Sequence, residues 1–309
     1  MASEVKIFSG TASRYLSEEI ANHFGRQLGK ITITRFQDGE MEPSFDESVR
    51  GDILFLIQST FGAADNLMEL LLMVDAARRA SADKIIVAMP YYGYARQDRK
   101  DKPRVSIGAK LVANLLTAAG ADRIVTMDLH AGQIQGFFDI PLDHLYGTGV
   151  FFPYLSKLGL TNVAVAAPDA GGTKRARSYA SYLKSDLILI DKFRERANEV
   201  ASMKVIGDVE GKNVLIVDDI VDTAGTLTQA ADHLLSEGAA SVRAVITHPL
   251  LSGPAYERIE ASGLTELITT NTIPLKQKCK KIKVISIAPL LAGAFKNIYN
   301  YESISTLYI

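Results

Sequence analysis

Seven short and almost continuously apolar runs constrain the fold of this chain more than any other feature. They are rich in β-branched residues and lie at 53–58, 84–89, 124–128, 163–167, 187–190, 214–217 and 242–247. Such runs are typical of strands that are buried on both faces of a parallel sheet. Helical repeats lie between them, for example from Leu67 to Ala77 and from Leu16 to Leu28, with Gly29 as the expected C-cap. We therefore expect an α/β fold that binds its ligands at the carboxyl ends of its strands.

A repeated pattern predicts two similar α/β domains. Gly120 precedes His130 by ten positions, Gly238 precedes His248 by ten, and a Leu-Leu pair lies before each glycine. A chain of 309 residues is also long enough for two domains with a core each. We place the N-terminal domain at 1–147 and the C-terminal domain at 148–309, with the last residues, from about 290 onward, able to pack back on the N-terminal domain.

The composition argues against several classes of protein. A net charge of −1 does not supply the basic field expected of a nucleic-acid binder. The single cysteine, Cys279, cannot form an internal disulfide and fits a reducing cytosol. No apolar run approaches the ~18 residues of a membrane span, and the first residues show no signal peptide. We expect a soluble, cytoplasmic enzyme with neither a nucleic-acid nor a membrane partner.

The most informative motif is the sequence NVLIVDDIVDTAGT at 213–226. A strand-like stretch ends in Asp218 and Asp219, and a turn of small residues then opens a helix: Asp222, Thr223, Ala224, Gly225 and Thr226. Backbone N–H groups at such a helix N-terminus bind phosphate, whereas the paired acids suit sugar hydroxyls or a divalent metal. Together they predict a pocket for a ribose 5-phosphate. The simpler alternative is a capped turn with Asp222 as the N-cap.

Two further loops carry polar residues that could bind a polyphosphate. The segment 96–104 holds five cations and two acids after a predicted strand, which suits a phosphate clamp, although a solvated surface loop is the usual explanation of a charge run. The loop of Phe36, Asp38, Gly39 and Glu40 combines an aromatic residue with two acids, and alone it would be read as a hairpin turn. The chain has neither a Walker loop nor the protein-kinase Gly-rich loop, so a nucleotide triphosphate would need another arrangement.

Metal and catalytic candidates follow other strands. His130 and Asp169 each stand at a predicted strand end and could share one Mg²⁺, most of whose ligands would be phosphate oxygens. Lys192, Arg194 and Arg196 follow the run 187–190 in a segment with few apolar anchors. We expect this segment to be mobile and its cations to close on bound phosphate, with ordinary surface charge as the alternative.

Taken together, these motifs resemble those of the ribose-phosphate diphosphokinases (phosphoribosyl pyrophosphate synthetases), in the class with allosteric control. The resemblance runs from Val5 to the C-terminus through FQDGE at Phe36, YARQD at Tyr94, DLHAGQIQGFFDIP at Asp128, PDAGG at Pro168, DKFR at Asp191 and VDDIVDTAGT at Val217. It implies two domains like those of type I phosphoribosyltransferases, each with a central, mostly parallel sheet flanked by helices. It also implies a homohexamer and the transfer of a diphosphoryl group from Mg-ATP to the C1 hydroxyl of ribose 5-phosphate, with AMP as the second product.

The resemblance assigns a role to each matching position. Ribose 5-phosphate would be bound by the Asp218–Asp219 pair and the turn before the helix: Asp222, Thr223, Ala224, Gly225 and Thr226. ATP would be bound by residues of both polar loops and by the strand-end histidine, with the Phe36 loop reaching in from a neighbouring subunit: Phe36, Asp38, Gly39, Glu40, Arg96, Gln97, Asp101 and His130. Mg²⁺ would lie at His130 and Asp169, and Lys192 and Arg194 would stabilise the transition state. A regulatory site, activated by phosphate and inhibited by ADP, would include Ser48, Arg50, Ser81 and Arg104.

Three departures and two rival functions accompany this hypothesis. Gly132 stands where the family usually has an acid or a small polar residue, and Phe193 and Glu195 stand where Arg or Lys, and Pro, are expected. A phosphoribosyltransferase would consume the product in the same pocket, but it would need neither the 96–104 segment nor the FQDGE loop. A catalytically silent regulatory homologue would be expected to lack His130, Lys192 or Arg194, and all three are present.

Overall fold

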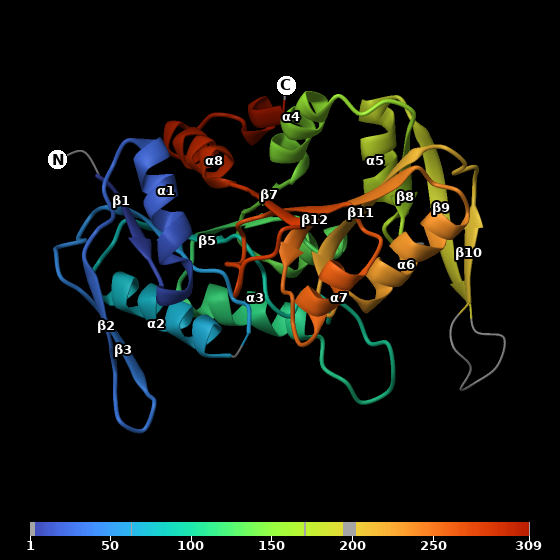
Figure 1. The fold of residues 1–309 in the computed structure, drawn as a ribbon. Coiled ribbons are helices and arrows are strands. Elements are labelled where there is room, and N and C mark those ends of the chain that lie inside the picture. Colours follow the sequence, from blue (N-terminus) through green and yellow to red (C-terminus); the bar gives the residue numbers. More distant parts are fainter. Residues whose placement is uncertain (1–3, 63, 170, 194–201, 309) are drawn as a thin grey trace. The chain divides into compact units, whose positions relative to one another are not determined.

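The structure is a computed structural model that describes residues 4–62, 64–169, 171–193 and 202–308, without the side chains of residues 192, 193 and 202 (Figure 1). The chain divides into two compact units. One is formed by Met1–Tyr146 together with Ile287–Ile309, and the other by Gly147–Ser286. Each unit has its own sheet and its own helices.

The first unit is built on a parallel five-stranded sheet. Its strand order is β1 (Val5–Ser9), β4 (Ile53–Ile57), β5 (Lys84–Met89), β6 (Arg123–Met127) and β7 (Leu142–Leu145). The helices of this unit are α1 (Arg14–Phe24), α2 (Asp65–Arg79), α3 (Gly108–Ala119) and α8 (Ala288–Asn300), with short 3₁₀ turns η1 (Thr11–Ser13), η2 (Gly132–Phe137) and η3 (Ile304–Tyr308). An antiparallel hairpin, β2 (Ile31–Arg35) and β3 (Met41–Phe45), projects from this unit in Figure 1.

The second unit is built on a seven-stranded sheet that is parallel except at one edge. Its strand order is β10 (Ser202–Ile206), β9 (Asp186–Phe193), β8 (Val163–Ala167), β11 (Asn213–Val221), β12 (Ser241–Pro249), β13 (Glu266–Thr270) and β14 (Ile282–Ile285). The edge strand β10 runs antiparallel to β9. The helices are α4 (Thr148–Leu158), α5 (Thr173–Leu183), α6 (Gly225–Ser236) and α7 (Ala255–Ala261).

Burial on both faces explains why the strand sequences are continuously apolar. In β11, Val214 and Ile216 join a core with residues of α6 and α7, whereas Leu215 and Val217 join a separate core with residues of α4 and α5. Successive side chains of a strand point to opposite faces, so a strand covered on both sides needs an apolar residue at every position. All seven apolar runs are strands of the two sheets, and the predicted α/β class is confirmed.

The C-terminal helix belongs to the first unit. Helices α1 and α8 lie side by side in Figure 1, and Lys296 Nζ donates a hydrogen bond to the His23 carbonyl at 3.0 Å. The rings of Phe55 in β4 and Phe295 in α8 stack with their centroids 4.1 Å apart. The final helix therefore covers the face of the first sheet that carries Phe55.

The end of the first helix was predicted wrongly. Helix α1 ends at Phe24, and its C-cap is Gly25, which has a left-handed φ of 91° and donates to the carbonyls of Ala21 and Asn22. Gly29 instead lies against the Phe8 ring, and its N–H donates to the Ile7 carbonyl at 2.8 Å. The chain leaves the helix one turn early because Leu28 and Gly29 run beside β1.

Candidate active site

The predicted ribose-phosphate loop joins β11 to α6. The strand continues through Asp218 and Asp219 to Val221, which pairs with Pro249 of β12, so the paired acids lie within the strand and not after it. Helix α6 begins at Gly225 behind the N-cap residue Ala224, which has a φ of 58°. The N-cap residue is Ala224, whose side chain carries no acceptor, so the alternative in which Asp222 is the N-cap residue is wrong. The first N–H groups of a helix lack intrahelical partners, which leaves this end suited to an anion.

Two carboxylates face a single guanidinium beside this loop. Arg175 Nη1, from α5, lies 3.0 Å from Asp219 Oδ1 and 3.5 Å from Asp218 Oδ1. Asp218 Oδ1 also accepts a hydrogen bond from the Asp219 N–H at 2.8 Å. Burial, followed by the negative charge of Asp219, raises the pKa of Asp218 above its ordinary value, while Arg175 opposes the shift. The pair therefore retains affinity for a further positive or hydrogen-donating group, such as a metal ion or a sugar hydroxyl.

Asp169 follows β8, the parallel neighbour of β11. It is exposed, and its Oδ1 accepts a hydrogen bond from the Gly172 N–H at 2.9 Å, which holds the turn that opens α5. Its position at the carboxyl edge of the second sheet is the one expected from the sequence. His130 follows β6 in the first unit and is also exposed.

The predicted FQDGE loop is the turn of the β2–β3 hairpin. The Phe36 N–H donates to the Glu40 carbonyl at 2.9 Å, and the Gly39 N–H donates to the Phe36 carbonyl at 3.0 Å. Gly39 has a φ of 97°, which glycine adopts without strain. Asp38 Oδ1 accepts a hydrogen bond from the Glu40 N–H at 3.1 Å, and the Phe36 side chain is 48% exposed. The hairpin geometry is thus explained locally, whereas the exposed aromatic ring is not required by the turn.

The basic segment lies in the long connection 90–107 between β5 and α3. Arg96, Gln97 and Asp101 are exposed. The connection is anchored at its ends, because the buried Tyr92 hydroxyl donates to the Ala109 carbonyl at 2.8 Å and the Gln97 carbonyl accepts from the Ala109 N–H at 3.2 Å. The polar side chains are therefore held at the carboxyl edge of the first sheet while remaining open to a ligand.

One catalytic candidate, Lys192, lies near the end of β9. Lys192 is part of this strand, opposite Met203 of β10, so the strand extends beyond the predicted run 187–190. Arg194, Arg196 and Glu195 fall outside the described residues.

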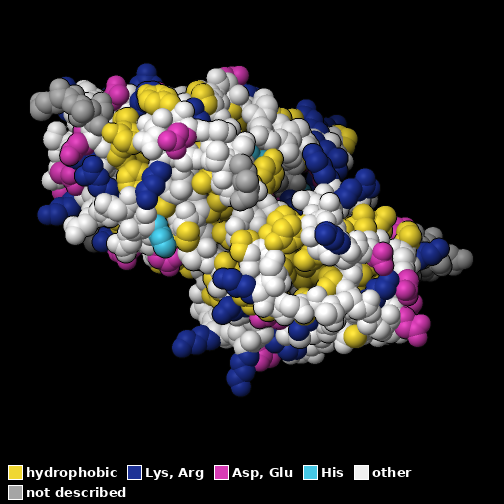
Figure 2. Space-filling model, turned by 90° about the horizontal axis from the view of Figure 1, so that it is seen from above, with side chains coloured by type: hydrophobic (Ala, Val, Ile, Leu, Met, Phe, Trp, Pro, Cys, Tyr) yellow, Lys and Arg dark blue, Asp and Glu magenta, His cyan; other side chains and the backbone are white. Residues whose placement is uncertain are grey.

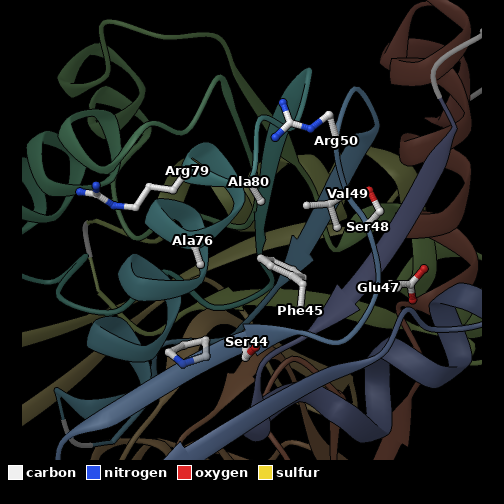
Figure 3. A pocket seen from close by; sticks show the side chains of 10 residues that line it. Ser44, Phe45, Glu47, Ser48, Val49, Arg50, Ala76, Arg79 and Ala80 are labelled. Atoms are coloured by element: carbon white, nitrogen blue, oxygen red, sulfur yellow. The ribbon is translucent and has the colours of Figure 1, made fainter.

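Two of the four predicted regulatory residues line a surface hollow in the first unit. Ser48 and Arg50 border a hollow of about 420 Å³ between the chain after β3 and helix α2 (Figure 3). Ser81 Oγ accepts a hydrogen bond from Arg50 Nη1 at 3.2 Å, which brings a third predicted residue to this place. Arg79 of α2 also lines the hollow, but in Figure 3 its side chain points away from Arg50, and its Nε donates to Asp75 Oδ2 at 2.6 Å. Arg104 lies in the 90–107 connection and is not one of the lining residues.

Within the ranges given above, no three His, Cys, Asp or Glu side chains come together as a preformed metal site. In the same part of the chain, no helix has the length and apolar character to cross a membrane. On the face drawn in Figure 2, basic and acidic side chains are both dispersed, in keeping with the net charge of −1.

Two arginines at this site were missed by the sequence analysis. Arg175 contacts both acids of β11, and Arg258 of α7 donates to the Thr223 carbonyl at 3.0 Å. Both come from helices distant in sequence from the loop, and neither belongs to a motif that marks it. The helical position of Arg175 directly after Pro168–Gly172 is the one signal that could have identified it.

Comparison with known proteins gives a consistent result. Residues 5–120 match the N-terminal domain of ribose phosphate pyrophosphokinase, and residues 193–309 match the phosphoribosyl synthetase-associated domain. The ribose-phosphate pyrophosphokinase of Porphyromonas gingivalis is 57% identical over 303 residues, which cover 98% of this chain and 97% of the relative. That of Wolinella succinogenes is 53% identical over 305 residues, covering 98% and 99%. The crystal structure of phosphoribosylpyrophosphate synthetase from Mycobacterium smegmatis, 39% identical, matches with a TM-score of 0.91 over 97% of this chain and 100% of that chain.

Proposed function

The chain belongs to the ribose-phosphate pyrophosphokinase family, and we propose that it transfers the diphosphoryl group of Mg-ATP to the C1 hydroxyl of D-ribose 5-phosphate. The products are 5-phospho-α-D-ribose 1-diphosphate and AMP, which would make this a cytoplasmic enzyme of nucleotide biosynthesis. The observation that carries the proposal is the identity of 57% across nearly the whole chain. The loop before α6 supports it independently, because paired acids next to an uncapped helix N-terminus suit a sugar phosphate.

Ribose 5-phosphate is proposed to bind along the end of β11. The ring hydroxyls would be held by Asp218 and Asp219, whose crowding disfavours two free carboxylates. The 5-phosphate would be held by the loop at the start of α6: Asp222, Thr223, Ala224, Gly225 and Thr226. An uncapped helix start supplies N–H donors without a neutralising side chain.

ATP is proposed to bind at the carboxyl edge of the first sheet, through Arg96, Gln97, Asp101 and His130. The remaining contacts would come from the β2–β3 turn of a neighbouring subunit: Phe36, Asp38, Gly39 and Glu40. The exposure of Phe36 at the tip of a projecting hairpin supports this, because an exposed ring is available to stack on a base. This assignment implies a homo-oligomer, and the hexamer of the resemblance is the form that we propose.

Mg²⁺ is proposed to bind with ATP, at His130 and Asp169. Asp169 fits this role because it is an exposed carboxylate at a strand end, and carboxylate and phosphate oxygens are the ligands that Mg²⁺ prefers. When bound, the ion would neutralise phosphate charge. The protein's part is to hold the nucleotide and the sugar so that the C1 oxygen lies in line with the β-phosphorus.

Lys192 and Arg194 are proposed as the catalytic cations. In the reaction, the C1 hydroxyl gives its proton to water or to a phosphate oxygen, and a bond forms between the C1 oxygen and the β-phosphorus. The bond from the β-phosphorus to the α–β bridging oxygen breaks, and its electron pair leaves on the oxygen of AMP. Negative charge grows on that bridging oxygen as AMP leaves, and fixed cations next to it lower the barrier. Lys192 lies near the end of β9, and only β8 separates β9 from β11, the strand that leads into the ribose-phosphate loop.

Regulation is proposed at the hollow beside Ser48 and Arg50, with Ser81 and Arg104, with phosphate as activator and ADP as inhibitor. The Arg50 guanidinium and the hydroxyls of Ser48 and Ser81 suit an anion of this kind. This would place the chain in the class with allosteric control.

The reaction is tested by ³¹P NMR of the full-length protein with Mg-ATP and ribose 5-phosphate. We expect AMP together with a new diphosphate attached to C1 of the sugar, and neither in a control without ribose 5-phosphate. Formation of ADP would make the protein an ordinary kinase and contradict the proposal. Binding of both substrates without turnover would support the catalytically silent homologue.

A further inference from the structure

Three consecutive carbonyl groups of the ribose-phosphate loop are held by one neighbouring segment. The Leu251 N–H donates to the Val221 carbonyl at 3.2 Å, and the Ser252 N–H donates to the Asp222 carbonyl at 2.9 Å. Arg258 Nη1 then donates to the Thr223 carbonyl at 3.0 Å. Because the segment 251–258 supplies all three donors, it fixes the orientation of three successive peptide groups.

The orientation of these carbonyls determines where the loop's N–H groups point. In a planar trans peptide, the C=O of one residue and the N–H of the next point in opposite directions. The N–H groups of Asp222, Thr223 and Ala224 must therefore point away from the segment 251–258. Successive N–H groups that point to the same side form a concave anion site, and the first turn of α6 continues it.

Arg258 provides the one side-chain donor among these three contacts. It is carried by α7, whose Tyr256 and Ile259 are buried in the core of the second unit. A Cβ atom added to Gly225 would lie 3.1 Å from Arg258 Nη1, so the guanidinium lies against the first residue of α6. Its charge is thus added to the positive end of the helix dipole.

We propose that Arg258 is a positioning residue for the 5-phosphate, an inference that rests on the proposed function. By holding the Thr223 carbonyl, it turns the Ala224 N–H toward the phosphate, and its charge favours a phosphorylated sugar over a neutral one. Ala224 needs this support, because its φ of 58° is a conformation that alanine rarely adopts. The rigid α7 supplies the anchor, and the loop supplies the contact with the ligand.

The inference predicts that substitution of Arg258 weakens the binding of ribose 5-phosphate and leaves the binding of ATP and the rate of the chemical step nearly unchanged. In Arg258→Met, KM for ribose 5-phosphate should rise about tenfold or more, the effect of losing one charge-assisted hydrogen bond. KM for ATP and kcat should change less than about twofold, since the catalytic cations and the first unit are untouched. Arg258→Lys, which keeps the charge and one donor, should recover part of the loss.

A matched control and a direct binding measurement complete the test. Arg177→Met removes an exposed guanidinium from α5 of the same unit and should leave both KM values unchanged. Calorimetric titration of ribose 5-phosphate, with Mg²⁺ and α,β-methylene ATP present, should show the same loss of affinity as the KM. An unchanged KM for ribose 5-phosphate in Arg258→Met, or equal changes in both KM values, would overturn the inference. If the Met variant does not fold, an unaltered KM in Arg258→Lys would overturn it equally. A wild-type protein with neither turnover nor affinity for ribose 5-phosphate would overturn the proposed function itself.

Discussion

Glu69 in the first unit and Asp218 in the second both lie near the carboxyl edge of a parallel sheet, but Glu69 is buried whereas the Asp218 side chain is 28% exposed, and their partners differ. Glu69 is 2% exposed and accepts three hydrogen bonds: from the Thr11 N–H at 2.6 Å, the Thr11 hydroxyl at 2.7 Å and Gln58 Nε2 at 2.9 Å. Asp218 lies beside a second carboxylate, and the two share Arg175. The first acid accepts its hydrogen bonds from the protein, so we assign it a structural role, whereas the second pair is the one that we propose to bind ribose 5-phosphate.

The connections that leave the carboxyl edges of the two sheets also differ, in this case in length. Strand β5 reaches α3 through residues 90–107, whereas β11 reaches α6 through residues 222–224 alone. A short connection brings backbone N–H groups together at the start of a helix, which suits a phosphate. A long one carries side chains away from the sheet edge, which suits a larger ligand with several groups to recognise. In the proposed assignment, the difference in length between these two connections adapts the same strand–helix unit to two different substrates.

The largest expected effect is at Lys192, near the end of strand β9 in the second sheet. Lys192→Ala should lower kcat by ~10²–10³ with little change in KM for ATP, because a fixed cation stabilises the leaving group in the transition state. Steady-state kinetics with Lys204→Ala as the control, an exposed lysine of the adjoining strand β10, would measure it. A rise in KM at constant kcat would assign Lys192 to substrate binding instead.

Glu69 tests whether a buried acid with three hydrogen bonds from the protein stabilises the fold. Glu69→Gln places an amide donor against existing donors in a buried site and should reduce the free energy of unfolding by roughly 1–3 kcal/mol. Differential scanning calorimetry of the two proteins would detect the lower midpoint. A variant as stable as the wild type would show that the three hydrogen bonds to Glu69 contribute no net stability.

Asp218 tests the proposed ligand-binding role, and here the substitution is expected to raise the free energy of unfolding, whereas Glu69→Gln is expected to lower it. Because its pKa is raised in the folded protein, folding takes up a proton, and stability falls as pH increases from the ordinary carboxyl range through the raised value. Asp218→Asn is neutral at every pH and should be more stable than the wild type by roughly 1 kcal/mol under alkaline conditions. It should also bind ribose 5-phosphate more weakly. Unfolding measured across pH would contradict the account if the variant were the less stable protein throughout.

The smallest expected effect is at the C-terminal end of the first unit. The Tyr308 hydroxyl accepts a hydrogen bond from the Tyr146 N–H at 2.7 Å, and burial raises the pKa of Tyr308 to about 12, so it remains neutral. Tyr308→Phe should lower the free energy of unfolding by about 1 kcal/mol. Tyr301→Phe, at a site that is 82% exposed, is the control and should change nothing measurable. Equal changes in the free energy of unfolding of the two variants would show that the hydrogen bond between Tyr146 and Tyr308 contributes no stability.

The fold class could be predicted because burial on two faces leaves a continuous apolar signal. The strands that the sequence did not reveal include β7 and β14, with the sequences LDHL and IKVI, whose alternating polar residues interrupt that signal. The hairpin β2–β3 was considered only as a turn. Gly29 was predicted as the C-cap of the first helix, and the cap is Gly25 because the chain at Leu28 already pairs with Ile7 of β1.

The candidate site was predicted where its residues are contiguous. Asp218 and the turn before α6 form one motif, so their proximity follows from the chain itself. Arg175 and Arg258 reach the same loop from α5 and α7, and such contacts depend on helix packing that no local pattern records. The same limit applies to Arg50 and Ser81, which a hydrogen bond joins across 31 positions.

The central claim is that the carboxyl edge of each sheet binds one of the two substrates. It is tested most directly by replacing one glycine with alanine at each edge, at the start of the helix that follows the loop. Gly225 opens α6 and Gly108 opens α3; an added Cβ would lie 3.1 Å from Arg258 Nη1 in the first case and 2.7 Å from Gln97 Oε1 in the second. We expect Gly225→Ala to raise KM for ribose 5-phosphate about tenfold and Gly108→Ala to raise KM for ATP by a similar factor, each leaving the other KM unchanged. If both variants altered the same KM, or if the two effects were exchanged, the assignment of the substrates to the two edges would be wrong.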